Sequence, residues 1–309
     1  MKGGNPLLRK KHLYVLSALC TITIVGCKSQ IKEVSLVSDI GEKSMGIKDI
    51  GDRKINLVDP TSGKIVKQIN LTSLGYFKDE KQYKLHIKKI ANEIGKQIDQ
   101  KMTPSRMTSE GRWEEGKPSY ELFEKELVED LMDVGIWDRS YELPISKKQP
   151  VAQLTDTNNN SKVIGKYTTN IVGTANGKME NIRLSANTIN GVILGKGDRF
   201  SFNALIGDTT PDKGYQLGKE IVAGKLVDAY GGGVCQTSST LYNAADQSGL
   251  KMIERYSHSK PVGYVPIGRD ATIAYPYFDL VFENTNDVPV QIFMKVEGNT
   301  LNAEIRMLI

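Results

Sequence analysis

Three consecutive glycines directly before a cysteine constrain this chain more than any other feature. Residues 231–233 lead through one valine to Cys235, and the residues after the cysteine have the apolar spacing of a helix that ends at Gly249. A cysteine at the start of a helix lies at the positive end of the helix dipole, which favours thiolate over thiol. The glycines leave backbone N–H groups uncovered there, and such groups can stabilise an oxyanion. The pattern predicts a nucleophilic cysteine.

A histidine and an aspartate follow the predicted helix. His258 lies in the turn-like segment SHSKP, and we predict that it carries the proton that a cysteine nucleophile must exchange. A third group usually orients such a histidine, and Asp270 is the candidate, with Ser257 and Tyr256 as alternatives. The other reading of Asp270 is an aspartate that hydrogen-bonds within its own turn.

Several residues around the cysteine are candidates for binding substrate or stabilising an oxyanion. The glycine N–H groups and the glutamine are predicted oxyanion donors. The serines either hydrogen-bond substrate or cap the helix. The arginine either binds a substrate carboxylate or pairs with Asp270. These candidates are Gly232, Gly233, Gln236, Ser238, Ser239 and Arg269.

The same stretch resembles the VanW family, which is named for an accessory protein of vancomycin resistance. The motifs that carry the resemblance are RFSFNALIGDTTPDKGY, GGGVCQTSSTLYNAA, ERYSHSKPVGYVPIGRDAT and FDLVFENTNDVPV, in the family's order, within residues 164–296. Lys196 stands where the family has a proline before a turn glycine, a change that alters turn stiffness more than chemistry. The resemblance implies a cysteine L,D-transpeptidase of the cell wall.

The implied substrate is the stem peptide of peptidoglycan. A thiolate would attack the amide between the third residue and the fourth, D-Ala, release D-Ala and leave a thioester. An amine from a neighbouring stem would resolve the thioester into a 3→3 cross-link, and water would make the protein a carboxypeptidase. The alternative is a non-catalytic protein that binds peptidoglycan or assists glycopeptide resistance, with Cys235 packed as a small hydrophobe.

The first 27 residues have the pattern of a lipoprotein signal peptide. A basic start precedes an apolar run that is short for a membrane span, and Cys27 ends a lipoprotein-like cleavage box. We predict lipid attachment at Cys27, with an uncleaved signal anchor as the alternative. The protein would then lie on the extracytoplasmic face of the bacterial cell membrane, anchored by lipid and reaching the cell wall.

Removal of this segment changes the cysteine count and the charge. Of the three cysteines, Cys20 lies in the signal and Cys27 is the predicted lipid site, so Cys235 is the one predicted free thiol of an exported chain, which indicates reactivity. The net charge falls from +5 to about +1 without the four basic residues of the signal, and no nucleic-acid partner is expected. One such cysteine with two distant histidines, His86 and His258, does not make a zinc site, and we expect no metal or cofactor.

The rest of the chain divides into a tether and two α+β domains. Residues 28–53 are polar and read as the tether. Residues 54–155 contain a hairpin pattern at 55–71 and helical patterns at 79–98 and 118–134, an order similar to the peptidoglycan-binding domain often found before VanW domains. A polar linker is predicted at 152–162.

Residues 164–309 form the predicted VanW-like domain. The fold class is α+β, with antiparallel strands around a central helix that carries the cysteine at its N-terminus. A short helix is predicted at 179–190 and a hairpin at 219–227. Other strands are predicted at 163–172, within 191–203, and at 263–266, 271–275, 278–284, 289–296 and 300–307.

Overall fold

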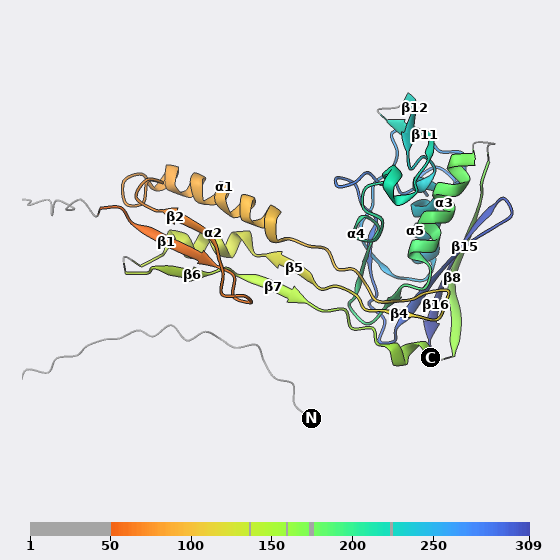
Figure 1. Cartoon of the computed structure of the whole chain (residues 1–309), viewed down its shortest axis with the longest axis horizontal. Helices are drawn as coiled ribbons and strands as arrows, with labels where there is room; N and C mark the ends of the chain where they lie inside the picture. Colours follow the sequence, from red (N-terminus) through yellow and green to blue (C-terminus); the bar gives the residue numbers. More distant parts are fainter. Residues whose placement is uncertain (1–50, 136, 159, 173–175, 223–224) are drawn as a thin grey trace, which may run out of the picture. The chain divides into compact units, whose positions relative to one another are not determined.

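The computed structural model describes residues 51–135, 137–158, 160–172, 176–222 and 225–309 (Figure 1). The predicted signal segment with Cys27, and the predicted tether up to residue 50, lie outside these ranges. All the elements below belong to the unit formed by residues 50–309. Helices combined with several antiparallel sheets confirm the predicted α+β class.

The first sheet has the strand order β2-β1-β6. The predicted hairpin is present as β1 (Lys54–Val58) and β2 (Ile65–Asn70), and β6 (Ser140–Glu142) pairs with β1 in parallel. Helix α1 (Glu80–Ile98) begins where predicted, because the Asp79 side chain accepts a hydrogen bond from the N–H of Gln82 and so caps it. Its apolar face packs with α2 (Glu124–Met132) over a core that includes Ile55, Leu57, Ile87, Ile94, Leu127 and Leu131.

The second predicted helix is wrong in its first part. Residues 118–134 show helical spacing, yet β5 (Ser119–Leu122) pairs antiparallel with β7 (Ile145–Lys148), and α2 starts only at Glu124. The backbone of Tyr120 also exchanges hydrogen bonds with Gln100. Strand pairing with a distant segment therefore satisfies backbone groups that the local pattern assigned to a helical turn.

Residues 101–107 make contacts with later parts of the chain. The short strand β3 (Arg106–Met107) pairs with β4 (Trp113–Glu114), and the Met107 N–H donates to the Gly191 carbonyl. Lys101 Nζ lies 2.9 Å from Asp279 Oδ2 and 3.0 Å from Glu254 Oε2. Because Asp279 is buried, this ion pair ties the segment after α1 to the core of the later domain.

The predicted linker is more structured than its composition indicates. It contains a 3-10 helix, η1 (Leu154–Asn158), and Ala152 is buried with Ile193 and Leu308. Strand β8 (Ser161–Asn170) starts before the linker was predicted to end. The predicted domain boundaries at 155 and 164 stay predictions.

The main sheet has the antiparallel order β8-β16-β15-β9. Its other members are β16 (Thr300–Leu308), β15 (Val290–Glu297) and β9 (Ile193–Leu194). Helices α3 (Asn176–Ile189) and α5 (Val234–Gln247) lie beside this sheet in Figure 1. They bury a continuous apolar core against it, with members that include Ile182, Ala186, Leu241, Ala245, Ile292 and Ile305.

A smaller sheet, β10-β14-β13, completes this core. It consists of β10 (Arg199–Ser201), β14 (Val281–Glu283) and β13 (Lys251–Glu254), with the rings of Phe200 and Phe282 stacked 4.7 Å apart. The short helices α4 (Phe202–Ile206) and η2 (Pro211–Lys213) lead to the hairpin of β11 (Leu217–Val222) and β12 (Lys225–Tyr230). This hairpin leads directly into the glycine run.

Two predicted strands are wrong. Residues 263–266 and 271–275 lie in the long segment between β13 and β14, which contains only isolated bridges such as Tyr256 with Thr272. Pro261 and Pro266 lack the N–H that a strand ladder requires, and Ala271 bonds to side chains of α5 instead of a strand. This segment, residues 255–280, is called the site loop below. Across the described ranges, no helix has the length and apolar character needed to cross a membrane.

Candidate active site

Cys235 is the second residue of helix α5, and the glycines set how that helix begins. Gly231 and Gly233 have φ of 88° and 109°, values that side-chain-bearing residues rarely adopt. Asn181 Nδ2 donates to the Gly232 carbonyl at 3.0 Å and so fixes the peptide group that joins Gly232 to Gly233. Among the described residues, the N–H groups of Gly232 and Gly233 donate to no acceptor. Both predicted oxyanion donors are therefore available for a ligand.

We expect Gly233→Ala to lower the free energy of unfolding by about 1–3 kcal/mol. A Cβ here would adopt an unfavourable φ and would lie 2.8 Å from Cγ of Lys178. Urea unfolding would measure the loss. Gly249→Ala is the matched control. Gly249 has φ of 75°, but a Cβ added there would meet no atom within 4 Å. This variant should therefore lose only the part of the free energy of unfolding that the unfavourable φ costs. Equal losses at both positions would contradict the steric argument.

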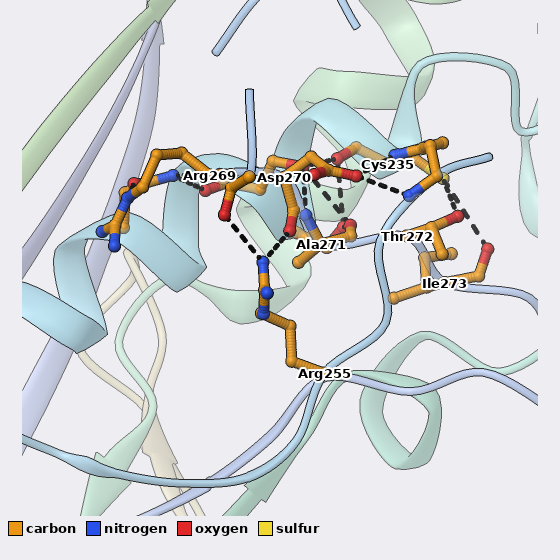
Figure 2. A network of polar contacts seen from close by, with 12 residues as sticks. Cys235, Arg255, Arg269, Asp270, Ala271, Thr272 and Ile273 are labelled. Carbon is orange, nitrogen blue, oxygen red and sulfur yellow. Dashed lines mark hydrogen bonds and ion pairs between the residues drawn. The ribbon is translucent and has the colours of Figure 1, made fainter. Parts of the chain in front are cut away.

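The sulfur of Cys235 faces the site loop (Figure 2). It lies 3.8 Å from the Thr272 hydroxyl and 3.6 Å from the Ile273 carbonyl oxygen. A carbonyl oxygen accepts a hydrogen bond from a thiol, whereas a hydroxyl can also donate to a thiolate. The two neighbours therefore suit both protonation states of the sulfur. Thr272 was not among the residues predicted from the sequence, although it ends the third quoted motif.

The two candidate serines attach the site loop to the first turn of α5. Ser238 Oγ and Ser239 Oγ both reach the Cys235 carbonyl and the Ala271 carbonyl, and the Ala271 N–H donates to Ser239 Oγ at 2.9 Å. Both side chains are fully buried. Of the two predicted roles, this geometry favours a local structural one, because the hydroxyls are already bonded within the protein.

The side chain of Gln236 faces β8. Its Nε2 donates to Thr169 Oγ1 at 3.0 Å and to the Asn170 carbonyl at 2.9 Å, and its own backbone N–H donates to the Gly233 carbonyl. These bonds use its backbone and side-chain donors. The geometry therefore speaks against the predicted oxyanion role of Gln236, because no N–H group is left to donate to substrate.

His258 and Asp270 form a hydrogen-bonded pair. Asp270 Oδ2 lies 2.7 Å from His258 Nδ1 and accepts a second hydrogen bond, at 2.6 Å, from the His258 backbone N–H. Both side chains are at least nine-tenths buried. Burial alone would raise the pKa of Asp270, but the two hydrogen bonds and the charge of His258 outweigh it, and the pKa lies below its ordinary value of 3.8. The predicted alternatives, Ser257 and Tyr256, are not needed to orient this ring.

Arg269 does not pair with Asp270. Its Nε donates to Asn243 Oδ1 at 2.7 Å, its Nη1 lies 2.8 Å from Asp246 Oδ2, and its guanidinium stacks over the Tyr242 ring. The charge is thus neutralised on the side of α5, which speaks against the predicted binding of a substrate carboxylate. Arg255, which was not predicted, donates instead to the Asp270 carbonyl (Figure 2).

Tyr264 is a further residue of the site that sequence reasoning missed. Burial raises the pKa of its hydroxyl strongly, and the charges of Cys235 and Asp270 add to that rise, while a hydrogen bond with Ser239 opposes it. The phenol of Tyr264 therefore belongs to the surroundings of Cys235, Ser239 and Asp270. Its position in the quoted motif, between His258 and Asp270, was the available signal.

A pocket of about 230 Å³ adjoins the histidine pair. The site loop alone forms it, with residues 257–262, 266–268 and Asp270 in its wall. In the part of the chain that the structure describes, no group of three or more His, Cys, Asp or Glu side chains could hold a metal ion. The site residues Cys235, His258 and Asp270 offer a thiol, an imidazole and a carboxylate.

Comparison with known proteins places this site in a family. The family model described as VanW like protein matches residues 177–306. The uncharacterized protein YoaR of Bacillus subtilis is 33% identical over 213 residues, which are 67% of this chain and 70% of YoaR. The chain belongs to the VanW family. The resemblance found in the four motifs is thereby confirmed.

A second VanW-family relative carries a functional name. The vancomycin B-type resistance protein VanW of Enterococcus faecalis is 31% identical over 133 residues, 41% of this chain. The match spans 48% of that protein, about half its length. No solved structure matches the chain. Cys235, His258 and Asp270 all lie inside the stretch that the family model covers.

Proposed function

We propose that this VanW-family protein modifies peptidoglycan as a cysteine L,D-transpeptidase on the extracytoplasmic face of the cell membrane, anchored there by lipid on Cys27. One observation carries the proposal. In the site loop, Asp270 holds His258, and Thr272 and Ile273 of the same loop contact the sulfur of Cys235. In the proposed mechanism this loop brings the base, His258, to the nucleophile, Cys235.

The proposed first half-reaction forms a thioester. His258 takes the proton of the Cys235 thiol, and the thiolate attacks the carbonyl carbon of the third stem residue. The N–H groups of Gly232 and Gly233 would stabilise the oxyanion. As the carbon–nitrogen bond breaks, the imidazolium donates the proton that it took from the thiol to the leaving nitrogen. The product is free D-Ala, with an amine and a carboxylate.

The second half-reaction transfers the acyl group. An amine of a neighbouring stem attacks the thioester and forms an amide, the sulfur leaves, and His258 carries the proton from the amine to the sulfur. The product is a 3→3 cross-link. Water as acceptor gives a shortened stem, which makes the same site a carboxypeptidase.

A second candidate function is non-catalytic binding of peptidoglycan as a glycopeptide-resistance accessory protein. The contact of the Cys235 sulfur with the Ile273 carbonyl favours it, because such a contact also suits a thiol that only packs. The printed name of the Enterococcus faecalis relative, a vancomycin resistance protein, fits either function. Both place the protein on stem peptides of the cell wall, the first as an enzyme and the second as a ligand-binding protein.

Peptidoglycan analysis separates these functions. Purified sacculi incubated with the full-length protein in detergent should gain 3→3 dimers, lose D-Ala from tetrapeptide stems, or both, as measured by mass spectrometry of the digested wall. The same protein alkylated at its thiols with iodoacetamide is the control and should produce neither change. Identical walls in both samples, with both proteins sedimenting with sacculi, would reject the enzyme and leave the binding protein.

A further inference from the structure

The pocket beside His258 contains a cation whose charge the protein leaves unbalanced. Lys260 lies in the wall two residues after the histidine. Among the described residues, no carboxylate lies within ion-pair distance of Lys260. The other ionisable groups in the wall are His258 and Asp270, and Asp270 already accepts two hydrogen bonds from His258. A negatively charged ligand would therefore find its partner at Lys260.

The remaining wall is mainly apolar, and the pocket is small. Pro261, Val262, Pro266 and Ile267 line it together with Gly268. Its volume of about 230 Å³ is below the range of roughly 300–1,000 Å³ that is typical of drug-sized ligands. The dimensions and the lining suit one small residue that has an apolar side chain and a free carboxylate.

We infer that this pocket is the subsite for the leaving amino acid, with Lys260 binding its terminal carboxylate. The inference rests on the proposed function and names the part of the substrate that the site recognises. Asp270 holds Nδ1 of His258, so Nε2 is the ring nitrogen that can deliver a proton. A residue in this pocket presents its amine to that histidine and its carboxylate to the lysine.

This arrangement makes the free carboxylate a requirement for binding. A stem that ends in D-Ala satisfies Lys260, whereas a C-terminal amide leaves the lysine without a charged partner. The Lys260 residue is exposed, so the ion pair is partly screened by solvent, and the expected preference for the acid over the amide is about 5-fold.

The test measures binding in the full-length Cys235→Ala protein, which cannot turn the probe over. Isothermal titration would compare a synthetic stem tetrapeptide with L-Lys at its third position and D-Ala at its end with the same peptide as its C-terminal amide. We expect the acid to bind about 5-fold more tightly. Adding Lys260→Gln should remove this preference, and Lys260→Arg should retain it. Lys251→Gln, which removes an exposed lysine of β13, should also retain it.

Several results would overturn the subsite. Equal affinities for the two peptides, a preference that survives Lys260→Gln, or no measurable binding of either peptide would each do so. Failure of the proposed function looks different. If the wild-type protein releases no D-Ala while the Cys235→Ala protein keeps its Lys260-dependent preference, catalysis is rejected and the subsite stands. Release of D-Ala without that preference rejects only the subsite.

Discussion

Cys235→Ala is expected to reduce D-Ala release and thioester formation by about 10⁴-fold to 10⁶-fold. In the proposed reaction the side chain supplies the sulfur that forms the carbon–sulfur bond, and no neighbouring group replaces it: Thr272 offers only a hydroxyl, and the hydroxyls of Ser238 and Ser239 are bonded to backbone carbonyls. Release of D-Ala from a stem tetrapeptide, followed by mass spectrometry, measures the loss. Intact-protein mass would show a thioester adduct with the wild type alone.

The interpretation of this variant depends on an unchanged fold. The thiol is partly exposed and alanine is a good helix former, so the unfolding temperature should change little. Ser248→Ala, at the other end of α5, is the matched control and should keep full activity. Retained D-Ala release in the Cys235→Ala protein would show that the activity does not proceed through this sulfur.

Asp270→Asn is expected to lower the rate of thioester formation by about 10²-fold to 10⁴-fold. The carboxylate accepts a hydrogen bond from Nδ1–H of His258. In the proposed mechanism it also stabilises the imidazolium that forms when the ring takes the thiol proton. An amide has no charge to offer, and its nitrogen can present a donor to Nδ1, which favours the wrong tautomer. Asp246→Asn breaks the pair with Arg269 without touching His258 and is the control.

The lowered pKa of Asp270 fixes where pH affects this pair. The carboxylate stays ionised throughout the neutral and mildly acidic range. Protonation of Asp270 should therefore not slow thioester formation by the wild-type protein until the pH falls below about 4. A carboxyl group whose pKa is lowered by folding stabilises the fold above its unfolded pKa and loses that contribution as the pH falls through its folded pKa. The difference in unfolding temperature between wild type and Asp270→Asn should therefore narrow below about pH 4. A difference that stays constant down to about pH 2 would contradict this.

Local patterns predicted the fold well where one element decides its own structure. Helix α1 has a capping aspartate and an uninterrupted apolar stripe, so its limits could be predicted closely from the sequence. The glycine run before Cys235 and the stop at Gly249 likewise bounded α5. The failures came where a distant segment decides. Residues 119–122 pair with β7, and Ala271 bonds to the serines of α5, partners that no local pattern contains.

The candidate site was predictable as a set of residue types more than as a geometry. The sequence placed Cys235, His258 and Asp270 together as candidates, and the structure joins the last two by hydrogen bonds. It could not show that Arg269 turns to Asp246, or that Gln236 faces β8, because both outcomes depend on the direction of a side chain in the packed core. Lys260 and Tyr264 lay in a recognised motif, but only the folded loop places Lys260 in the pocket wall and Tyr264 within hydrogen-bond reach of Ser239.

The order of strands in the main sheet sets the timing of folding. Strand β16, residues 300–308, lies between β8 and β15 and pairs with both. Until these residues have been synthesised, β8 has no neighbour in the sheet, and α5 lacks part of the surface on which it packs. Contacts between such distant segments form slowly, because a long loop must close first. The surface on which the helix with Cys235 packs is therefore completed only after the last strand of the sequence has been made.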